Sequence, residues 1–498
     1  MQKFKAYLIP FVILVLSFLL RVSLLSAGPY HTDCLALAIN AQNTLASHQI
    51  HYQFGSGYIL TVLGGSFFVG LGKMLGIHDP VVCVNFMSAV FSSLTVFVLY
   101  FVVKKLADSM AALLSGILFS LSPIFLSVSV YGNSHTVSIF FLVLGIFFFC
   151  KYSGTSLQRY FILSALSIGL MATARLQDMI LMIIPLSALI SSAMTTRRLN
   201  LFFKNLFWFF SIAFLTTLTI YLFLFLENNF SQFFNQFSVF WKLGLKDNFR
   251  GIISGSLNRS FSYLSESFSL LGLITGYLGF YLLLKNKPKI FVFLFIWFLI
   301  PLLFYGNLHT TAPRFLNLIL PPFIAAIGYL FSQICKINPR FRVTGLAIFL
   351  IMLFFPFRNI YPVVAFRHTY NLLPDFLKWM ATKTEKNALI ISGDEDIFIR
   401  YYAGRSSFPR PLDQFFLKDI LLEEFKQKLN KLLEKNTPVY IISTGLFAYD
   451  PGLKFSSYIK ANYKLIFLGK RWSEDWHRGE LVLHTGPMAL FRVVKKTE

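Results

Sequence analysis

Long apolar runs, separated by short polar segments, fill the chain up to about residue 360. A helix needs about 20 mostly apolar residues to cross the hydrocarbon core of a bilayer. By this criterion we predict about eleven spanning helices, at residues 6–25, 81–103, 110–130, 134–150, 160–174, 179–195, 201–226, 267–284, 290–305, 315–335 and 343–357. Residues 57–76 are equally apolar, and hydropathy alone would count them as a twelfth span.

The pattern changes near residue 371, where short apolar stretches alternate with charged ones. Short runs rich in β-branched residues predict strands, and apolar faces with a 3.6-residue period predict helices. The predicted strands are 388–392, 438–443, 465–468, 481–484 and 489–494, and the predicted helices are 421–435 and 455–463. This alternation is typical of a small α/β domain.

Composition supports the same division of the chain. Hydrophobic residues make up 56% of the 498 residues, which is more than a soluble protein of this length carries. Seven of the 22 Asp and Glu residues precede residue 363, and fifteen follow it. We therefore predict a polytopic α-helical membrane domain at 1–362 and a C-terminal α/β domain at 363–498.

The positions of the basic residues predict the orientation of the membrane domain, because Lys and Arg are enriched in short cytoplasmic loops. With eleven spans and a cytoplasmic N-terminus, fifteen basic residues lie on the cytoplasmic side: Lys3, Lys5, Lys104, Lys105, Lys151, Arg159, Arg197, Arg198, Lys204, Lys285, Lys287, Lys289, Lys336, Arg340 and Arg342. If 57–76 also crossed, all of them beyond the N-terminus would lie outside. We predict instead that 57–76 lies along the outer surface or re-enters. The loops 26–80 and 227–266 and the C-terminal domain are then extracytoplasmic.

Charge and cysteine content exclude several other classes of function. The net charge of +23 comes largely from the loop residues that set topology, so we expect no nucleic-acid partner. The four cysteines form no spaced pair, which argues against a disulfide framework or a zinc site. Asp394-Glu395-Asp396 follows a predicted strand, and we interpret it as a solvated turn with a helix cap. The alternative for these three acids is a divalent metal site, which we favour less, and we expect no cofactor.

Asp33 is the first acidic residue of the chain and follows the first span, in His31-Thr32-Asp33. A carboxylate beside the bilayer of a polytopic protein is costly and often functional. On the predicted topology Asp33 lies at the outer mouth of the helix bundle, and we interpret it as a catalytic base. The alternative is an N-cap for a helix at 34–46, and the two roles are compatible.

Other ionisable side chains gather at the predicted outer ends of the spans. Arg175 and Asp178 follow the fifth span three residues apart, and they either pair with each other or provide an arginine for a phosphate. Arg314 begins the tenth span, as an interfacial anchor or as a contact to a lipid phosphate. His135, after the third span, and His31 are further candidates for the same site.

The predicted spans carry no Asp, Glu, Lys or Arg near their middle. Ion-coupled transporters usually have ionisable groups at the midplane of the membrane, and many are built from internal repeats. Neither feature is evident in the sequence, so a lipid or glycan transporter, such as a flippase, is the less favoured hypothesis. The charges at the outer ends favour a site at the outer membrane surface that receives a substrate from the lipid.

The layout resembles the GT-C glycosyltransferases that use polyprenyl-phosphate sugars, such as protein O-mannosyltransferases and bacterial lipid A aminoarabinose transferases. The acid in the first outer loop, Asp33, matches the pattern of these enzymes, as does a soluble α/β domain outside the membrane. The other matching segments are Leu71-Gly-Lys-Met-Leu-Gly76, Val102-Val-Lys-Lys105, Leu121-Ser-Pro-Ile-Phe125, Ala172-Thr-Ala-Arg175 and Arg314-Phe-Leu-Asn-Leu-Ile-Leu-Pro-Pro322. The resemblance covers nearly the whole chain.

The resemblance implies an integral enzyme of the bacterial or archaeal cytoplasmic membrane that moves a sugar from a polyprenyl-phosphate donor to an acceptor hydroxyl. The acceptor is a protein, a lipid or a glycan. Because the leaving group of such a donor is already a phosphate, one base suffices, unlike the two carboxylates of glycoside hydrolysis. We assign that role to Asp33, with inversion at the anomeric carbon. The substrate-binding candidates are His31, His135, Arg175, Asp178 and Arg314.

A lipid-linked glycan polymerase or ligase is the enzymatic alternative. Such an enzyme is expected to carry a large outer loop rich in arginine and histidine. The predicted loop 227–266 has two lysines, two arginines and no histidine. The sequence therefore favours the transfer of a sugar from a polyprenyl-phosphate donor.

Overall fold

The computed structural model describes residues 2–51, 58–187, 199–227, 238, 242, 246, 248–309, 311–393, 395–409, 419–447, 453–474 and 480–496. The chain divides into two units. The first, which we call the helical unit, contains Met1–Pro29, Leu37–His368 and Gly479–Val482. The second, the C-terminal unit, contains Tyr30–Ala36, Thr369–Arg478 and Leu483–Glu498.

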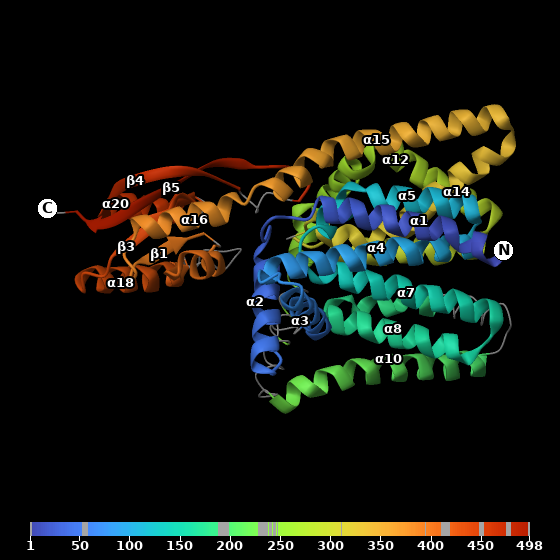
Figure 1. The fold of residues 1–498 in the computed structure, drawn as a ribbon, viewed down its shortest axis with the longest axis horizontal. Helices are drawn as coiled ribbons and strands as arrows, with labels where there is room; N and C mark the ends of the chain where they lie inside the picture. The colour runs from blue at the N-terminus through green and yellow to red at the C-terminus, as the bar shows by residue number, and fades with distance from the viewer. Residues whose placement is uncertain are drawn as a thin grey trace. The chain divides into compact units, whose positions relative to one another are not determined.

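The helical unit is a bundle of mostly apolar helices (Figure 1). The first turn of α2 is grouped with the C-terminal unit. The elements are α1 (Gln2–Ser23), α2 (Thr32–Ser47), α3 (Ile59–Met74), α4 (Pro80–Leu106), α5 (Ser109–Leu121), α6 (Pro123–Ser129), α7 (Ser134–Thr155), α8 (Gln158–Ala174), η1 (Leu176–Met182), α10 (Leu199–Glu227), α12 (Ser256–Asn286), α13 (Pro288–Tyr305), η2 (Pro313–Ile319), α14 (Leu320–Ile337) and α15 (Pro339–Thr369).

The predicted polytopic helical fold is confirmed, and the described residues of the predicted spans are largely helical. Within the described part of the chain, seven helices are long and apolar enough to cross a membrane. An eighth span is formed if α5 and α6 are one helix, bent by 57° where Pro123 cannot continue the hydrogen-bond ladder. The predicted spans 6–25, 160–174 and 179–195 fall on the shorter helices α1, α8 and Leu176–Ser187, with 188–195 outside the described residues. Length and hydropathy thus support seven or eight of the eleven predicted spans.

The apolar segment 57–76 forms α3, which packs against α4 and α8. Figure 1 shows α3 nearly end-on, whereas α4, α7, α8 and α10 run along the bundle. The helix therefore lies across the bundle, which is the orientation expected of a helix at the membrane surface and not of a span.

Neighbouring helices approach closely where glycines face them. Moving through the bundle, α10 packs on α8, α8 on α7, α7 on α4, and α5 on α14, which also contacts α12. A Cβ added at Gly279 of α12 would overlap the Ala326 carbonyl of α14, and one added at Gly328 would overlap Ser115 of α5. Small residues at these crossings let the helices pack at close range, as is common in membranes.

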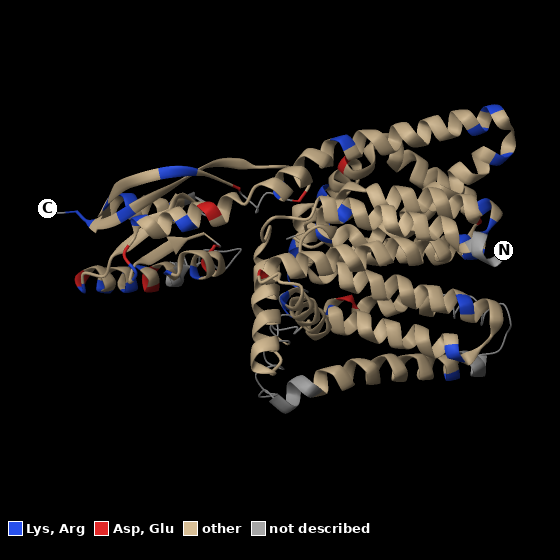
Figure 2. Ribbon diagram, in the orientation of Figure 1, with Lys and Arg blue, Asp and Glu red and all other residues tan. Residues whose placement is uncertain are grey.

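Charged residues lie at the two ends of the bundle, and the helices between them are largely uncharged (Figure 2). At the end that carries the N-terminus the charges are mostly basic. This is the end that the distribution of Lys and Arg assigns to the cytoplasm. Arg197 and Arg198 lie outside the described residues. The orientation in a membrane stays a prediction.

Asp108 caps α5 and links it to α14. Its carboxylate accepts the Ala111 N–H at 2.9 Å, the Ser332 hydroxyl at 2.8 Å and the Lys336 ammonium at 2.7 Å. Burial alone would raise the pKa of Asp108, but the hydrogen bonds from Lys336, Ala111 and Ser332 and the charge of Lys336 outweigh it and lower this pKa.

We expect Asp108→Asn to lower the free energy of unfolding by about 0.5–1 kcal/mol at neutral pH, because the asparagine keeps the cap and loses an ion pair with the half-exposed Lys336. The folded-state pKa of Asp108 lies below its ordinary value of 3.8. The stabilisation is therefore complete above that value and is lost as pH falls through the folded-state pKa. Thermal unfolding in detergent at a series of pH values tests this. If the stability of wild type and variant fell equally with pH, the predicted role of the Asp108 ion pair would be contradicted. Asp396→Asn is the control, because Asp396 forms an exposed pair with Arg400.

The C-terminal unit is a small α/β domain, as predicted. Its five-stranded sheet has the order β2-β1-β3-β5-β4, with β1 parallel to β2 and β3 and with β5 antiparallel to β3 and β4. Ile391, Ile441, Phe455 and Ile459 are part of its buried core. The elements are α16 (Leu372–Lys383), β1 (Leu389–Ser392), α17 (Asp396–Phe398), the π-helix η3 (Ile399–Ala403), β2 (Ser406–Pro409), α18 (Asp419–Glu434), β3 (Val439–Ile442), α19 (Ser443–Phe447), α20 (Lys454–Asn462), β4 (Tyr463–Glu474) and β5 (Thr485–Lys495).

Two segments differ from the sequence prediction. The predicted loop 227–266 lies partly outside the described residues, but its last part is helical, because α12 begins at Ser256. The Ser260 hydroxyl donates to the carbonyl of Gly306, the residue after α13, at 2.7 Å. The predicted strand 481–484 is not a strand. Residues 480–482 belong to the helical unit, where side chains bind the backbone carbonyl of Glu480 in place of a neighbouring strand.

Candidate functional site

The loop between α6 and α7 is held by side-chain amides. Asn133 precedes α7 in an extended conformation, with φ of −160°, and its side-chain oxygen accepts the Thr136 N–H at 3.0 Å. This is N-cap geometry, which satisfies a donor that the first turn of a helix leaves unpaired. The Asn133 amide nitrogen donates to the Tyr131 carbonyl at 2.7 Å. Asn85 of α4 accepts the Gly132 N–H at 2.7 Å, so the loop is fixed to α4.

Phe315 of η2 is the centre of a cluster of charged and aromatic side chains. Its ring lies edge-on to the ring of His135, with 5.3 Å between the centroids. The guanidinium groups of Arg175 and Arg314 lie over the Phe315 ring, 5.3 and 5.1 Å from its centroid. Such positions are favourable because the face of an aromatic ring attracts cations. We call His135, Arg175, Arg314 and Phe315 the Phe315 cluster. The structure thus brings together three predicted site residues from distant parts of the chain.

Arg175 and Asp178 form the ion pair that their spacing suggested, with 3.0 Å between Nη1 and Oδ1. Both side chains are buried. The hydroxyl groups of Ser138 and Tyr305 also donate to the Asp178 carboxylate, and Arg175 lies over the Tyr305 ring, 5.2 Å from its centroid. A buried carboxylate with this many donors is well compensated. The pair therefore has a structural role, and its contact with a substrate stays a prediction.

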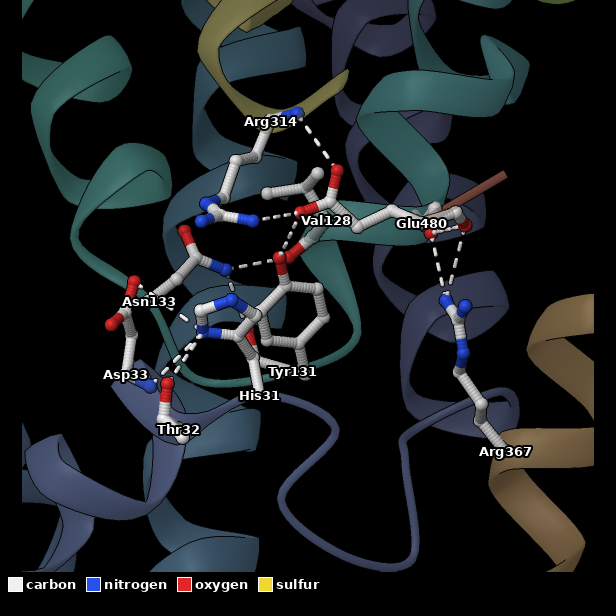
Figure 3. Close-up of polar contacts among 10 residues, drawn as sticks. His31, Thr32, Asp33, Val128, Tyr131, Asn133, Arg314, Arg367 and Glu480 are labelled. Atoms are coloured by element: carbon white, nitrogen blue, oxygen red, sulfur yellow. Dashed lines mark hydrogen bonds and ion pairs between the residues drawn. The ribbon is translucent and has the colours of Figure 1, made fainter. Parts of the chain in front are cut away.

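Arg314 binds a carboxylate that the sequence did not single out (Figure 3). Glu480 accepts the Arg314 backbone N–H through Oε2 at 3.0 Å and the guanidinium through Oε1 at 2.8 Å. The Tyr131 hydroxyl donates to the same Oε1 at 3.3 Å. The Glu480 carbonyl accepts the Ser127 hydroxyl at 2.6 Å and the Arg367 guanidinium at 3.2 Å. Glu480 is only 1% exposed, so its charge is removed from solvent and matched by Arg314.

His31 and Asp33 lie at the start of α2, in the segment that belongs to the C-terminal unit. The His31 ring accepts the Asp33 backbone N–H through Nδ1 at 3.0 Å (Figure 3). Because α2 begins at Thr32, His31 occupies the N-cap position. The helix starts earlier than the predicted 34–46, so Asp33 lies in its first turn. The alternative role of Asp33 as a cap stays a prediction.

The Asp33 carboxylate is 3.4 Å from the same His31 Nδ1, and the side chain of Asp33 is 33% exposed. A ring nitrogen that accepts an N–H cannot also donate a proton to a carboxylate. His31 thus orients the first turn of α2. The arrangement is compatible with a carboxylate that accepts a proton from a substrate.

Among the described residues, no three His, Cys, Asp or Glu side chains lie close enough together to hold a metal ion. Glu395 is described, whereas Asp394 lies outside the described part of the chain. A reaction without a metal or cofactor stays a prediction.

Comparisons with known proteins agree with this architecture. The family model described as oligosaccharyl transferase STT3, N-terminal, matches residues 51–353. A comparison with curated protein sequences finds no match.

Solved structures with the same fold include ArnT from Cupriavidus metallidurans in the apo state, with a TM-score of 0.60 and 11% identity over 99% of this chain and 98% of that one. The same protein bound to undecaprenyl phosphate gives a TM-score of 0.58 and 10% identity over 97% of each chain. The Archaeoglobus fulgidus oligosaccharyltransferase tethered with an acceptor peptide gives a TM-score of 0.57 and 13% identity over 98% of this chain and 74% of that one.

At these identities the solved structures establish the fold, whereas the family match covers more than half of the chain. The protein therefore belongs to the oligosaccharyl transferase STT3 family and is a glycosyltransferase of the GT-C superfamily, whose members use polyprenyl-linked sugars.

Proposed function

We propose that the protein transfers a sugar from a polyprenyl-phosphate donor to an acceptor hydroxyl at the outer face of the membrane, with inversion at the anomeric carbon. The Phe315 cluster is the observation that carries this proposal. It gathers two arginines and a histidine around one ring, in a bundle whose helices are largely uncharged between their ends (Figure 2). Guanidinium groups bind phosphate oxygens well. The related fold of ArnT from Cupriavidus metallidurans has been solved with undecaprenyl phosphate bound.

The two arginines have different surroundings, and we assign them different roles. Arg175 is committed to Asp178 and is buried, so it holds the Phe315 cluster in place. Arg314 is the second residue of η2, and its side chain is 18% exposed, so it is the stronger candidate for contact with the donor phosphate. His135 lines the same cluster at the start of α7.

In the proposed reaction Asp33 takes the proton of the acceptor hydroxyl. The acceptor oxygen then attacks the anomeric carbon from the face opposite the phosphate, and the bond between that carbon and the phosphate oxygen breaks. The polyprenyl phosphate leaves as an anion near Arg314, which stabilises the charge that develops on it. The base contributes by assisting proton transfer, and His31 supports it by orienting the first turn of α2.

A second candidate function is the transfer of a lipid-linked oligosaccharide to a peptide acceptor. The family match at residues 51–353 favours it, and the Archaeoglobus fulgidus oligosaccharyltransferase has been solved with a tethered acceptor peptide. The two functions differ in the number of sugar residues moved and in the acceptor, so they can be separated by the products.

Turnover in proteoliposomes tests the proposal. Radiolabelled polyprenyl-phosphate mannose, glucose, galactose and aminoarabinose would be supplied separately, with and without EDTA. We expect one donor to release polyprenyl phosphate at the same rate in both conditions. Inhibition by EDTA would contradict the prediction of a metal-independent reaction. If a folded protein turned over none of the donors but transferred a lipid-linked oligosaccharide, the second candidate would replace the first.

We expect Arg314→Gln to raise the KM for the donor by about 10-fold to 100-fold, because a charge-assisted hydrogen bond is worth about 1.5–3 kcal/mol. Arg314→Lys keeps the charge without the planar fork, and its KM should lie between those of wild type and Arg314→Gln. Initial rates over a range of donor concentrations measure this. Arg358→Gln, at an exposed position of α15, is the control. An unchanged KM in Arg314→Gln would remove Arg314 from the donor site.

A further inference from the structure

The Glu480 carboxylate occupies a preformed set of oxyanion donors in the helical unit. The donors are the Arg314 backbone N–H, the Arg314 guanidinium and the Tyr131 hydroxyl, and their bonds to the two carboxylate oxygens are 3.0, 2.8 and 3.3 Å long. Figure 3 shows the side chains of Arg314 and Tyr131 pointing toward Glu480 from separate segments of the chain. A backbone N–H, a guanidinium and a hydroxyl that converge on one anion also suit the oxygens of a phosphate.

The backbone of Glu480 is held separately from its side chain. The Ser127 hydroxyl and the Arg367 guanidinium bind the Glu480 carbonyl, and Arg367 also donates to Ser127 at 2.9 Å. These bonds do not involve the carboxylate. The side chain can therefore leave the Arg314 donors by rotation about its own bonds, while the backbone keeps its two partners.

We propose that Glu480 is an internal occupant of the phosphate site, and that the phosphate of a polyprenyl phosphate displaces its carboxylate from Arg314 and Tyr131. This inference rests on the proposed function for the identity of the phosphate. It adds Tyr131 to the phosphate-binding residues. It also implies that the apparent affinity for the lipid phosphate is lower than the intrinsic affinity, because the carboxylate must be displaced before the phosphate binds.

Binding of undecaprenyl phosphate to the purified full-length protein in detergent tests the inference without any transfer reaction. Glu480→Gln keeps the size and the acceptor oxygen of the side chain but removes its charge. We expect its Kd for undecaprenyl phosphate to be about tenfold lower than that of wild type. This corresponds to wild-type protein in which the state with the Glu480 carboxylate on Arg314 is about tenfold more populated than the state without it. Glu423→Gln, which removes an exposed charge on α18, should bind like wild type and controls for net charge.

On this inference, the gain in affinity of Glu480→Gln depends on Arg314. In Glu480→Gln/Arg314→Gln the gain in affinity should disappear, because the donor for which the two anions compete is gone. Undecaprenol, which has no phosphate, should bind equally to wild type and Glu480→Gln. Binding of inorganic phosphate would be measured in the same way, to distinguish a site that binds the free ion from one that also requires the lipid chain.

The outcomes separate this inference from the proposed function. If wild type binds undecaprenyl phosphate and Glu480→Gln binds it no more tightly, Glu480 only anchors the chain, and the inference fails while the proposed donor site stands. If neither protein binds it, both fail. If Glu480→Gln does not fold, Glu480→Asp replaces it, because the shorter acid keeps its charge but reaches Arg314 less well. Tighter binding by Glu480→Asp supports displacement, and equal or weaker binding overturns it.

Discussion

Asp33→Asn is expected to lower kcat for sugar transfer by about 10²-fold to 10⁴-fold, which is the usual contribution of a general base. Asparagine has the same size and cannot accept the proton of the acceptor hydroxyl. The cap of α2 should survive, because the bond from the Asp33 backbone N–H to His31 does not involve the replaced carboxylate. The KM for the donor should change little, since the phosphate contacts are assigned to Arg314.

Initial rates in proteoliposomes, with folding checked by thermal unfolding in detergent, measure this change. Asp375→Asn makes the same substitution at an exposed position of α16 and should leave the rate unchanged. If Asp33→Asn turned over at near the wild-type rate, Asp33 would not be the base. A parallel loss of rate and thermal stability would assign Asp33 a structural role.

Arg175→Met is expected to give the largest loss of stability, about 3–5 kcal/mol, because it leaves the buried Asp178 carboxylate without its cation. The hydroxyl groups of Ser138 and Tyr305 would still donate to Asp178, but neither carries a compensating charge. Loss of Arg175 also removes the cation over the Phe315 ring. Unfolding of the purified protein in detergent, followed by denaturant or by temperature, measures the change.

The double variant Arg175→Met/Asp178→Leu separates the charge from the packing. Replacing a buried ion pair by apolar side chains of similar size is often close to neutral. We therefore expect the double variant to be more stable than Arg175→Met alone. If the two substitutions were simply additive, the stability effect of Arg175 would not arise from its pairing with Asp178.

The sequence predicts the helices of the membrane domain well, because each span must satisfy its backbone within a run of apolar residues. The three-residue spacing of Arg175 and Asp178 likewise predicts their ion pair. It does not predict that α3 lies across the bundle, since an apolar run of this length suits either orientation. The distribution of Lys and Arg was needed to distinguish the two.

Two residues that join the predicted site residues only through tertiary packing, Phe315 and Glu480, were not predicted from the sequence. Phe315 is one of 59 phenylalanines, and nothing in its neighbourhood marks it as the ring that joins His135, Arg175 and Arg314. Glu480 is an isolated acid beside Leu481-Val-Leu483, a pattern that predicts a strand. Its place in the helical unit depends on donors more than a hundred residues away in the chain.

The central claim is tested most directly by identifying the lipid that the enzyme releases. The protein in proteoliposomes would be given a mixture of polyprenyl-phosphate sugars and diphosphate-linked oligosaccharide, and the lipid products would be identified by mass spectrometry. Our account predicts polyprenyl monophosphate formed from a single-sugar donor, in an amount equal to the sugar transferred, and a marked fall in that product with Asp33→Asn. Polyprenyl diphosphate as the released lipid, or sugar movement across the membrane with the donor intact, would contradict it.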